Sequence, residues 1–308
     1  MKSTTIQLWN RKIQEAVAIA HDAPFNDIDL KKVADQLCVS VDIFSHKFTE
    51  LHGESYKQFV KRSRLEAGAG YLRHSDYSIS QISELCGYTN SSFSKAFRAM
   101  FHNSPVAFRD IPILHNEVHT LERTNIITAA HQKNMENIFT VDRTENVRLP
   151  NYALYYNILP SSNDPVHSLV AYMTTYTYQL QAIKASVPMS GAMIITGTLD
   201  VVPVTNYSRM MMYVGLLLPN TTDNDIAHLH IKLAFQEPFG LLTRRIPGGD
   251  YKKLPVPMSF AAAGLPMYQF INNNCRAGHF KMSSNHFFIS LTGMNDCEIY
   301  IPWMKRTL

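Results

Sequence analysis

Two short stretches of the chain carry polar side chains at the spacing of one helical face. Phe44 and Phe48 form an apolar pair at i, i+4 spacing in the first stretch, and Phe93 and Phe97 repeat it in the second. Because a helix turns every 3.6 residues, the face opposite each pair is left to hydrogen-bonding groups. Such groups on a slim helix can contact base edges and phosphates in the DNA major groove. The outward residues are Asp42, Ser45, His46 and Thr49 in the first stretch, and Ser91, Ser94, Lys95 and Arg98 in the second.

These stretches belong to a longer pattern that occurs twice. Leu30 corresponds to Ile79 and Ser40 to Thr89, each partner lying 49 residues further along the chain. Each copy predicts a short helix, a tight turn, and a second helix whose first turn is capped by a hydroxyl group. This is the helix-turn-helix arrangement. A single copy could equally belong to a structural bundle with solvated polar residues, whereas two copies can reach groove segments about 34 Å apart.

Basic side chains beside the two units are candidates for holding the phosphate backbone. They are Lys47, Arg62, Arg64 and Lys95. Each could also be an ordinary solvated charge, since the net charge of +4 and the isoelectric point near 8.7 permit nucleic-acid binding without requiring it. If these residues do contact phosphates, the affinity for DNA must fall steeply as the salt concentration rises.

The pattern of apolar residues changes near residue 146 and predicts a multidomain chain. Residues 1–112 read as an all-α domain with two helix-turn-helix units, closed by Pro112. Residues 113–145 are polar and are expected to be a linker with some helix. Residues 146–308 show the order β, α, β, β twice, which predicts an α+β domain of two βαββ halves. The expected strands are 147–159, 209–218, 227–235, 286–293 and 297–303, and the expected helices are 166–185 and 261–272.

The stretch from Ile28 to Arg109, about a quarter of the chain, resembles the DNA-binding module of AraC/XylS-type transcription regulators. The matching motifs are RLEAG (Arg64–Gly68), SISQIS (Ser78–Ser83), CGY (Cys86–Tyr88), FSKAF (Phe93–Phe97) and SPVAFR (Ser104–Arg109). The resemblance implies two helix-turn-helix units on a seven-helix scaffold, with double-stranded promoter DNA as the partner. It also implies a bacterial transcription regulator that is not an enzyme, with RNA polymerase as a further candidate partner.

Two departures from this family pattern have consequences. The segment between Gly87 and Phe93 is one residue shorter than usual, which could rotate the second recognition helix. Asp42 lies where many members have a neutral or aromatic residue, and a carboxylate accepts a hydrogen bond from cytosine N4 but repels phosphate. We therefore expect a modest affinity for DNA, or reliance on a second protomer.

The C-terminal part resembles GyrI-like effector-binding domains, more loosely, at Arg148–Tyr156, Arg245–Tyr251 and Asp296–Pro302. An AraC-type module followed by such a domain resembles the Rob type of regulator and implies a groove that binds an effector. Aromatic walls with one carboxylate suit a lipophilic or cationic small molecule. The expected ligand-binding residues are Glu298, Tyr156, Tyr213, Tyr251, Tyr300 and Trp303, although each aromatic could instead serve the core. A hydrolase of small molecules that uses Glu298, or a protein-contact surface, are the alternatives.

Metal and cofactor chemistry find little support in the sequence. Its four cysteines form no C-x-x-C pair and predict neither a disulfide framework nor a zinc site. His115 and His119, and likewise His228 and His230, lack a third ligand nearby, and no phosphate-loop or nucleophile motif occurs. We expect no metal and no cofactor. The absence of a long apolar run and of a signal-peptide pattern makes a cytoplasmic protein without membrane association the expectation.

Overall fold

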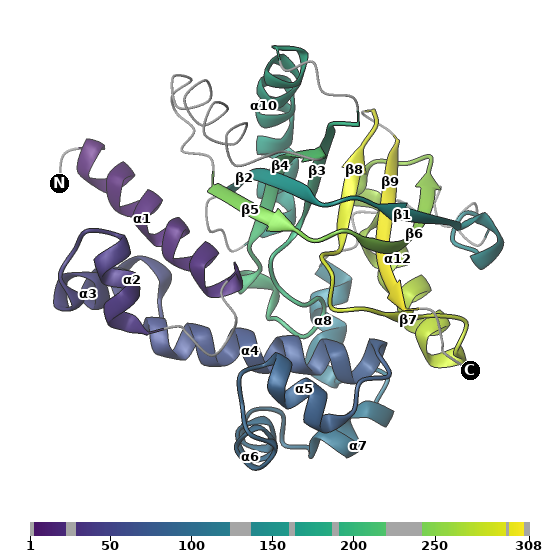
Figure 1. Cartoon of the computed structure of the whole chain (residues 1–308), viewed down its shortest axis with the longest axis horizontal. Helices are drawn as coiled ribbons and strands as arrows, with labels where there is room; N and C mark the ends of the chain where they lie inside the picture. Colours follow the sequence, from purple (N-terminus) through teal and green to yellow (C-terminus); the bar gives the residue numbers. More distant parts are fainter. Residues whose placement is uncertain are drawn as a thin grey trace. The chain divides into compact units, whose positions relative to one another are not determined.

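A computed structural model describes residues 3–22, 29–123, 137–159, 164–186, 191–219, 242–293 and 296–304 (Figure 1). The chain separates into two compact units. The first comprises Met1–Leu72 and Tyr77–Asp110, and the second comprises Arg73–Asp76 and Ile111–Leu308. The stretch expected to be a linker therefore contributes to the second unit, which contains α8 (His115–Arg123).

The regular elements of the first unit are all helices within the described residues. They are α1 (Ser3–Asp22), α2 (Leu30–Gln36), α3 (Val41–His52), α4 (Tyr56–His74), α5 (Ile79–Leu85), α6 (Asn90–Phe101) and α7 (Pro105–Asp110). Their beginnings follow local capping chemistry. The side chains of Ser40 and Thr89 accept hydrogen bonds from the backbone N–H groups of Ile43 and Ser92, at 3.3 and 3.2 Å. The two predicted hydroxyl caps are thus confirmed.

The turns of the two helix-turn-helix units have the same geometry. Cys38 and Gly87 occupy equivalent positions after α2 and α5, and both have positive φ values, 53° and 71°. The N–H of Val39 donates to the carbonyl of Ala34, just as Tyr88 donates to Ser83 in the second unit. Both turns are therefore Schellman-type helix ends of equal length. The short segment after Gly87 does not make the second turn differ from the first.

Aromatic side chains hold each unit against the long helix α4. Phe44 and Phe48 are fully buried and pack on Tyr56, with ring centroids 5.3 and 5.0 Å from the Tyr56 ring. Phe93 is also fully buried, and a Cβ atom added at Gly68 of α4 would lie only 2.8 Å from its ring. The missing side chain at Gly68 thus lets the second unit pack closely on α4.

The second unit contains one curved antiparallel sheet with two long helices. Its strands are β1 (Glu145–Leu149), β2 (Tyr152–Ile158), β3 (Met193–Thr198), β4 (Met212–Pro219), β5 (Leu242–Ile246), β6 (Gly249–Val256), β7 (Lys281–Met282), β8 (Phe288–Leu291) and β9 (Cys297–Met304). The helices α10 (Pro165–Ser186) and α12 (Phe260–Ala277) lie between them in the chain. Within the described residues the strand order is β1-β6-β9-β8-β3-β4-β2-β5, and β7 pairs with β9.

Strand pairing follows the same rule in each run of strand, helix, strand and strand. β2 pairs with β4 and β4 with β3, just as β6 pairs with β9 and β9 with β8. β3 and β8 then join the two runs. The strands that precede each run are exchanged, because β1 leads into β2 but pairs with β6, while β5 leads into β6 but pairs with β2.

A tight backbone contact marks the place where the two exchanged connections meet. A Cβ atom on Gly248 would lie 2.7 Å from the carbonyl oxygen of Leu149 and 2.8 Å from the carbonyl carbon of Pro150. The Gly248 N–H donates to Asn151 Oδ1 at 2.7 Å. The turn at Pro247-Gly248-Gly249 therefore serves backbone packing, which explains why glycine is needed there.

The sequence predicted most of these elements but missed several strands. The helices expected at 166–185 and 261–272 are confirmed as α10 and α12. The single strand expected at 147–159 is wrong, because Pro150 and Asn151 separate β1 from β2. β3, β5, β6 and the two-residue β7 were not predicted. The strand expected at 227–235 lies outside the described residues.

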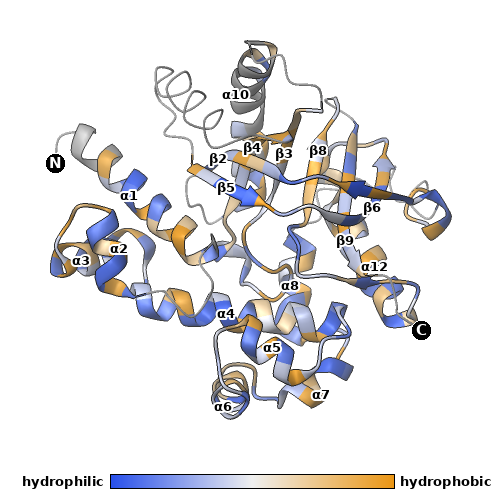
Figure 2. Cartoon of the chain, viewed as in Figure 1, coloured by the Kyte–Doolittle hydropathy of each residue, from blue (hydrophilic) through white to orange (hydrophobic). Residues whose placement is uncertain are grey.

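The sheet buries one face against its helices. Tyr155, Val214 and Ile299 of the sheet share a core with Phe270 and Ile271 of α12. Figure 2 shows that the central strands β4 and β8 are predominantly apolar. Among the helices in the described ranges, none is long and apolar enough to cross a bilayer.

Candidate nucleic-acid interface and effector site

The outward face of α3 carries the polar residues that the sequence placed there. Asp42, His46 and Thr49 are exposed, and Ser45 is half-buried. The Thr49 hydroxyl donates to the Ser45 carbonyl at 2.9 Å, which leaves its oxygen available as an acceptor. The helical spacing thus brings these four side chains to the surface of one helix, opposite Phe44 and Phe48.

The outward face of α6 has a different charge. Ser91, Lys95 and Arg98 are exposed and Ser94 is half-buried. The helix from Asn90 to Phe101 contains two basic residues and no acidic one, whereas α3 contains Asp42 and Glu50 besides Lys47. The outward face of α6 therefore carries a net positive charge, and that of α3 does not.

Lys47 is engaged within α3. Its ammonium group lies 2.6 Å from Glu50 Oε2, and its side chain is only 20 % exposed. The hydrogen bond from Lys47 lowers the pKa of Glu50, with smaller contributions from the charges of Lys47 and His46. A contact between Lys47 and phosphate would have to compete with this carboxylate.

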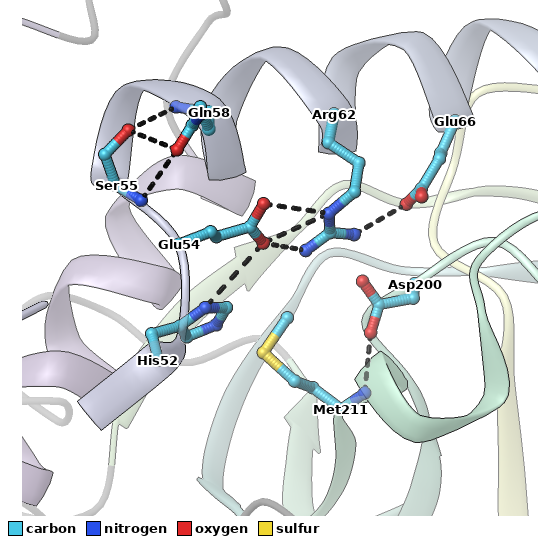
Figure 3. A network of polar contacts seen from close by, with 8 residues as sticks. All are labelled: His52, Glu54, Ser55, Gln58, Arg62, Glu66, Asp200 and Met211. Carbon is cyan, nitrogen blue, oxygen red and sulfur yellow. Dashed lines mark hydrogen bonds and ion pairs between the residues drawn. The ribbon is translucent and has the colours of Figure 1, made fainter. Parts of the chain in front are cut away.

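Arg62 lies in a buried ion-pair network (Figure 3). Its guanidinium group is 2.7 Å from Glu54 Oε1 and 2.9 Å from Glu66 Oε2. The Arg62 side chain is 10 % exposed, and His52 Nδ1 lies 3.8 Å from the same Glu54 oxygen. Two carboxylates and burial thus engage Arg62 within the scaffold, and a DNA phosphate would have to compete with both of them.

Arg64 is partly buried in α4. Burial lowers its pKa, while the nearby side chains of Tyr88, Cys86 and Tyr56 act in the opposite direction. Cys86 and Tyr88 belong to the turn of the second helix-turn-helix unit and Tyr56 begins α4, so the Arg64 side chain lies beside the second unit. Of the four basic candidates, Lys95 is the one whose side chain is exposed.

Ile43 is a residue of α3 that the sequence reasoning missed. Its side chain is 52 % exposed, although isoleucine is normally found in protein interiors. Its position directly after Asp42 was the available signal, since helical spacing puts residue 43 beside the outward face rather than among the phenylalanines.

In the second unit, four of the expected ligand-binding tyrosines share the sheet face opposite the helices. Tyr156 and Tyr213 have ring centroids 5.7 Å apart, and Tyr213 Oη lies 2.7 Å from His286 Nε2. The Tyr251 hydroxyl donates to the backbone carbonyl of His286 at 3.0 Å. Tyr300 completes the cluster by stacking on Phe288 with a centroid distance of 4.7 Å. The sequence had not singled out His286, which joins these rings.

Burial and nearby charged side chains set the electrostatics of this aromatic face. Burial raises the pKa values of Tyr213 and Tyr251, and nearby Arg244 acts in the opposite direction on both. Glu298 accepts a hydrogen bond from the Tyr300 hydroxyl at 2.9 Å and pairs with Lys253 at 2.7 Å. The Glu298 side chain is 22 % exposed, and Lys253 already serves as the cationic partner of its carboxylate.

Trp303 is separated from the four tyrosines. Successive residues of a strand point to opposite faces, and Trp303 packs against the helix-side core that contains Ile299 and Ile301. The Lys252 ammonium group lies 4.5 Å from the centre of its ring. Trp303 therefore contacts a cation that the chain itself supplies, on the other side of the sheet from Glu298.

Within the described part of the chain, no cluster of three or more His, Cys, Asp or Glu side chains could hold a metal ion. His115 and His119 both lie in α8, and among the described residues they belong to no such cluster. His228 and His230 lie outside the described residues.

Comparison with known proteins finds relatives of the N-terminal part of the chain. Residues 33–111 match the family model described as a helix-turn-helix domain. The transcriptional regulator AlkR of Acinetobacter baylyi is 29% identical over 109 residues, which cover 35% of this chain and 36% of AlkR. PocR, a regulatory protein of Salmonella typhimurium, is 33% identical over 85 residues, covering 27% of this chain and 28% of PocR. The chain thus spans about a third of the length of these curated relatives.

Two solved structures are each similar to a portion of the chain. The DNA-binding domain of AdpA in complex with a target DNA is 26% identical with a TM-score of 0.31, covering 32% of this chain and 88% of that one. SAV2435 bound to tetraphenylphosphonium is 12% identical with a TM-score of 0.34, covering 52% of this chain and 93% of that one.

The family match and the geometry coincide on the same residues. The matched range begins in α2 and ends directly after α7, so it contains both turns and both recognition helices. Its relatives are named as transcription regulators. Residues 33–111 of this chain therefore form a helix-turn-helix domain similar to those of these transcription regulators.

Proposed function

We propose that the whole chain is a transcription regulator that binds promoter DNA through both helix-turn-helix units. The observation that carries this proposal is the repeated geometry of the two units. Both turns are the same, both phenylalanine pairs are fully buried, and both second helices present polar side chains to solvent. Two such helices on one scaffold suit two successive segments of a major groove. RNA polymerase would be a further partner if the protein activates transcription.

Base-contacting residues of α3 provide a test. DNA that binds the full chain would first be selected from a random library, and its affinity measured by mobility shift. Ser45→Ala and His46→Ala are each expected to weaken binding about tenfold, because one lost base contact costs roughly 1–3 kcal/mol. Glu15→Ala in α1, whose carboxylate pairs with Arg11 of the same helix at 3.1 Å, is the matched control and should bind normally. Equal affinities of all three variants would contradict the proposal.

We also propose that the second unit is an effector-binding domain built from two βαββ halves, as in GyrI-like domains, with a lipophilic cation as its ligand. The supporting observation is the face that carries Tyr156, Tyr213, Tyr251 and Tyr300 with Glu298 beside them. Aromatic rings attract cations through their quadrupoles, and a carboxylate adds charge pairing. A bound cation would replace Lys253 Nζ, which lies 2.7 Å from Glu298.

Thermal unfolding with two ions of the same shape tests this ligand class. Tetraphenylphosphonium is expected to raise the Tm of the second unit, whereas the anion tetraphenylborate should not. Glu298→Gln should abolish the shift, because the bound cation that replaces Lys253 would then have no anionic partner. Asp250→Asn removes a more exposed carboxylate of the neighbouring strand, 46 % exposed, and should leave the shift unchanged. No response to either ion would instead favour a protein-contact surface, and turnover of the ligand would favour a hydrolase.

A further inference from the structure

Ile43 is an apolar side chain on a surface that otherwise carries polar groups. It is the third residue of α3 and is 52 % exposed. The centre of the outward face is the direction opposite Phe44 and Phe48. At 100° of rotation per residue, residues 43 and 49 lie at similar angles from that direction, one on each side. Its exposure therefore follows from helix geometry, and the side chain projects beside Asp42 and His46 from the helix expected to enter the groove.

We infer that Ile43 recognises the 5-methyl group of a thymine in the operator. This inference rests on the proposed DNA binding. In the major groove, thymine is the base that presents a methyl group, and aliphatic side chains distinguish it by apolar contact. Covering an exposed isoleucine with another apolar group is favourable because it removes apolar surface from water without burying a polar group, and the thymine methyl is the apolar group that the groove offers.

The second unit lacks this feature at the equivalent position. Residue 92, which lies 49 positions after residue 43, is a serine. The Ser92 hydroxyl is 2.8 Å from Thr89 Oγ1 and donates to the Thr89 carbonyl at 3.0 Å, so it is used in capping α6. The thymine contact is therefore specific to the half-site bound by α3. The neighbouring Asp42 carboxylate suits cytosine N4, so a cytosine near that thymine is expected in the same half-site.

The test removes the methyl group from the DNA and from the protein independently. Each thymine of the selected operator is replaced in turn by deoxyuridine, which keeps the hydrogen-bonding edge and lacks only the methyl. The wild-type chain is expected to lose about fourfold affinity at one thymine of the α3 half-site, equivalent to about 0.8 kcal/mol for one buried methyl-sized group. Ile43→Ala and Ile43→Ser should bind thymine DNA less tightly and show no further loss at that position.

Controls separate this inference from the proposed function on which it rests. Val106→Ala removes another exposed aliphatic side chain, 66 % exposed on α7, and should retain the wild-type response to deoxyuridine. If the wild-type chain binds no DNA at all, the proposed function fails. If it binds, but Ile43→Ala responds to every thymine replacement as the wild type does, the inference about Ile43 is wrong and the proposed function stands. Circular dichroism of the variants checks that they remain folded.

Discussion

Replacing both Lys95 and Arg98 by alanine is expected to reduce DNA affinity by at least tenfold at physiological salt and to flatten its salt dependence. These are the two basic residues of α6, both exposed, on a helix without acidic residues. Each phosphate contact releases condensed counterions, so the slope of log K against log salt should fall in magnitude by about 0.9 per lost contact, or about 1.8 for both. Titrations between 50 and 200 mM salt, roughly the range in which this effect is large, measure the slope.

A charge-matched variant distinguishes contact from bulk charge. Lys57 and Lys61 of α4 are likewise two basic residues about one helical turn apart, are exposed, and lie outside α3 and α6. Their double replacement by alanine removes the same charge but should change the slope only slightly. Equal slopes for the two double variants would mean that α6 makes no particular phosphate contacts and that net charge alone attracts DNA.

Glu117→Ala is expected to destabilise the second unit by about 3–5 kcal/mol, the cost of leaving a buried charge without its partner. Glu117 Oε2 lies 2.8 Å from Arg73 Nη2, and each side chain is only 1% exposed. The same carboxylate oxygen accepts the backbone N–H of Leu114 at 2.7 Å, at the beginning of α8. Denaturant unfolding, followed by a probe in the second unit, measures the loss.

Two comparisons make this prediction specific. Replacing both partners, Arg73→Met with Glu117→Leu, should restore most of the lost stability, because an apolar pair of similar volume carries no uncompensated charge. Arg148 and Asp250 form an ion pair at 3.4 Å with side chains 82 % and 46 % exposed. Asp250→Ala should therefore cost at most about 1 kcal/mol. A similar small cost for Glu117→Ala would show that the Arg73 charge finds other compensation.

Local chemistry made the first unit predictable. Hydroxyl caps at Ser40 and Thr89 and the phenylalanine pairs specify where each helix begins and which face it buries, because both signals act within one or two helical turns. The same reasoning placed the eight outward residues on the surfaces of α3 and α6. It missed Ile43, because an aliphatic residue in an amphipathic helix is normally assigned to the core.

Predictions that depend on distant partners were less successful. Arg62 carries the same charge as any solvated arginine, and the fold gave it Glu54 and Glu66 as buried partners. Trp303 and Tyr300 illustrate a different kind of error: they are three residues apart on one strand, and the expected ligand set overlooked the local alternation that sends them to opposite faces. The strands β5 and β6 were overlooked because their pairing with β2 and β1 involves a strand exchange that no local pattern reports.

The sequence by itself determined the two helix-turn-helix units, their buried and outward faces, and the change to an α+β domain near residue 146. Periodicity, caps and turn residues encode these features locally. Tertiary structure alone decided which charges are available and which tyrosines meet. Arg62 is neutralised in the scaffold, Glu298 is paired with Lys253, and His286 joins Tyr213 to Tyr251. The physical reason is that a side chain's charge and hydrogen-bonding capacity act through whatever lies within a few ångströms of it, and in a sheet with exchanged strands those neighbours come from distant parts of the chain.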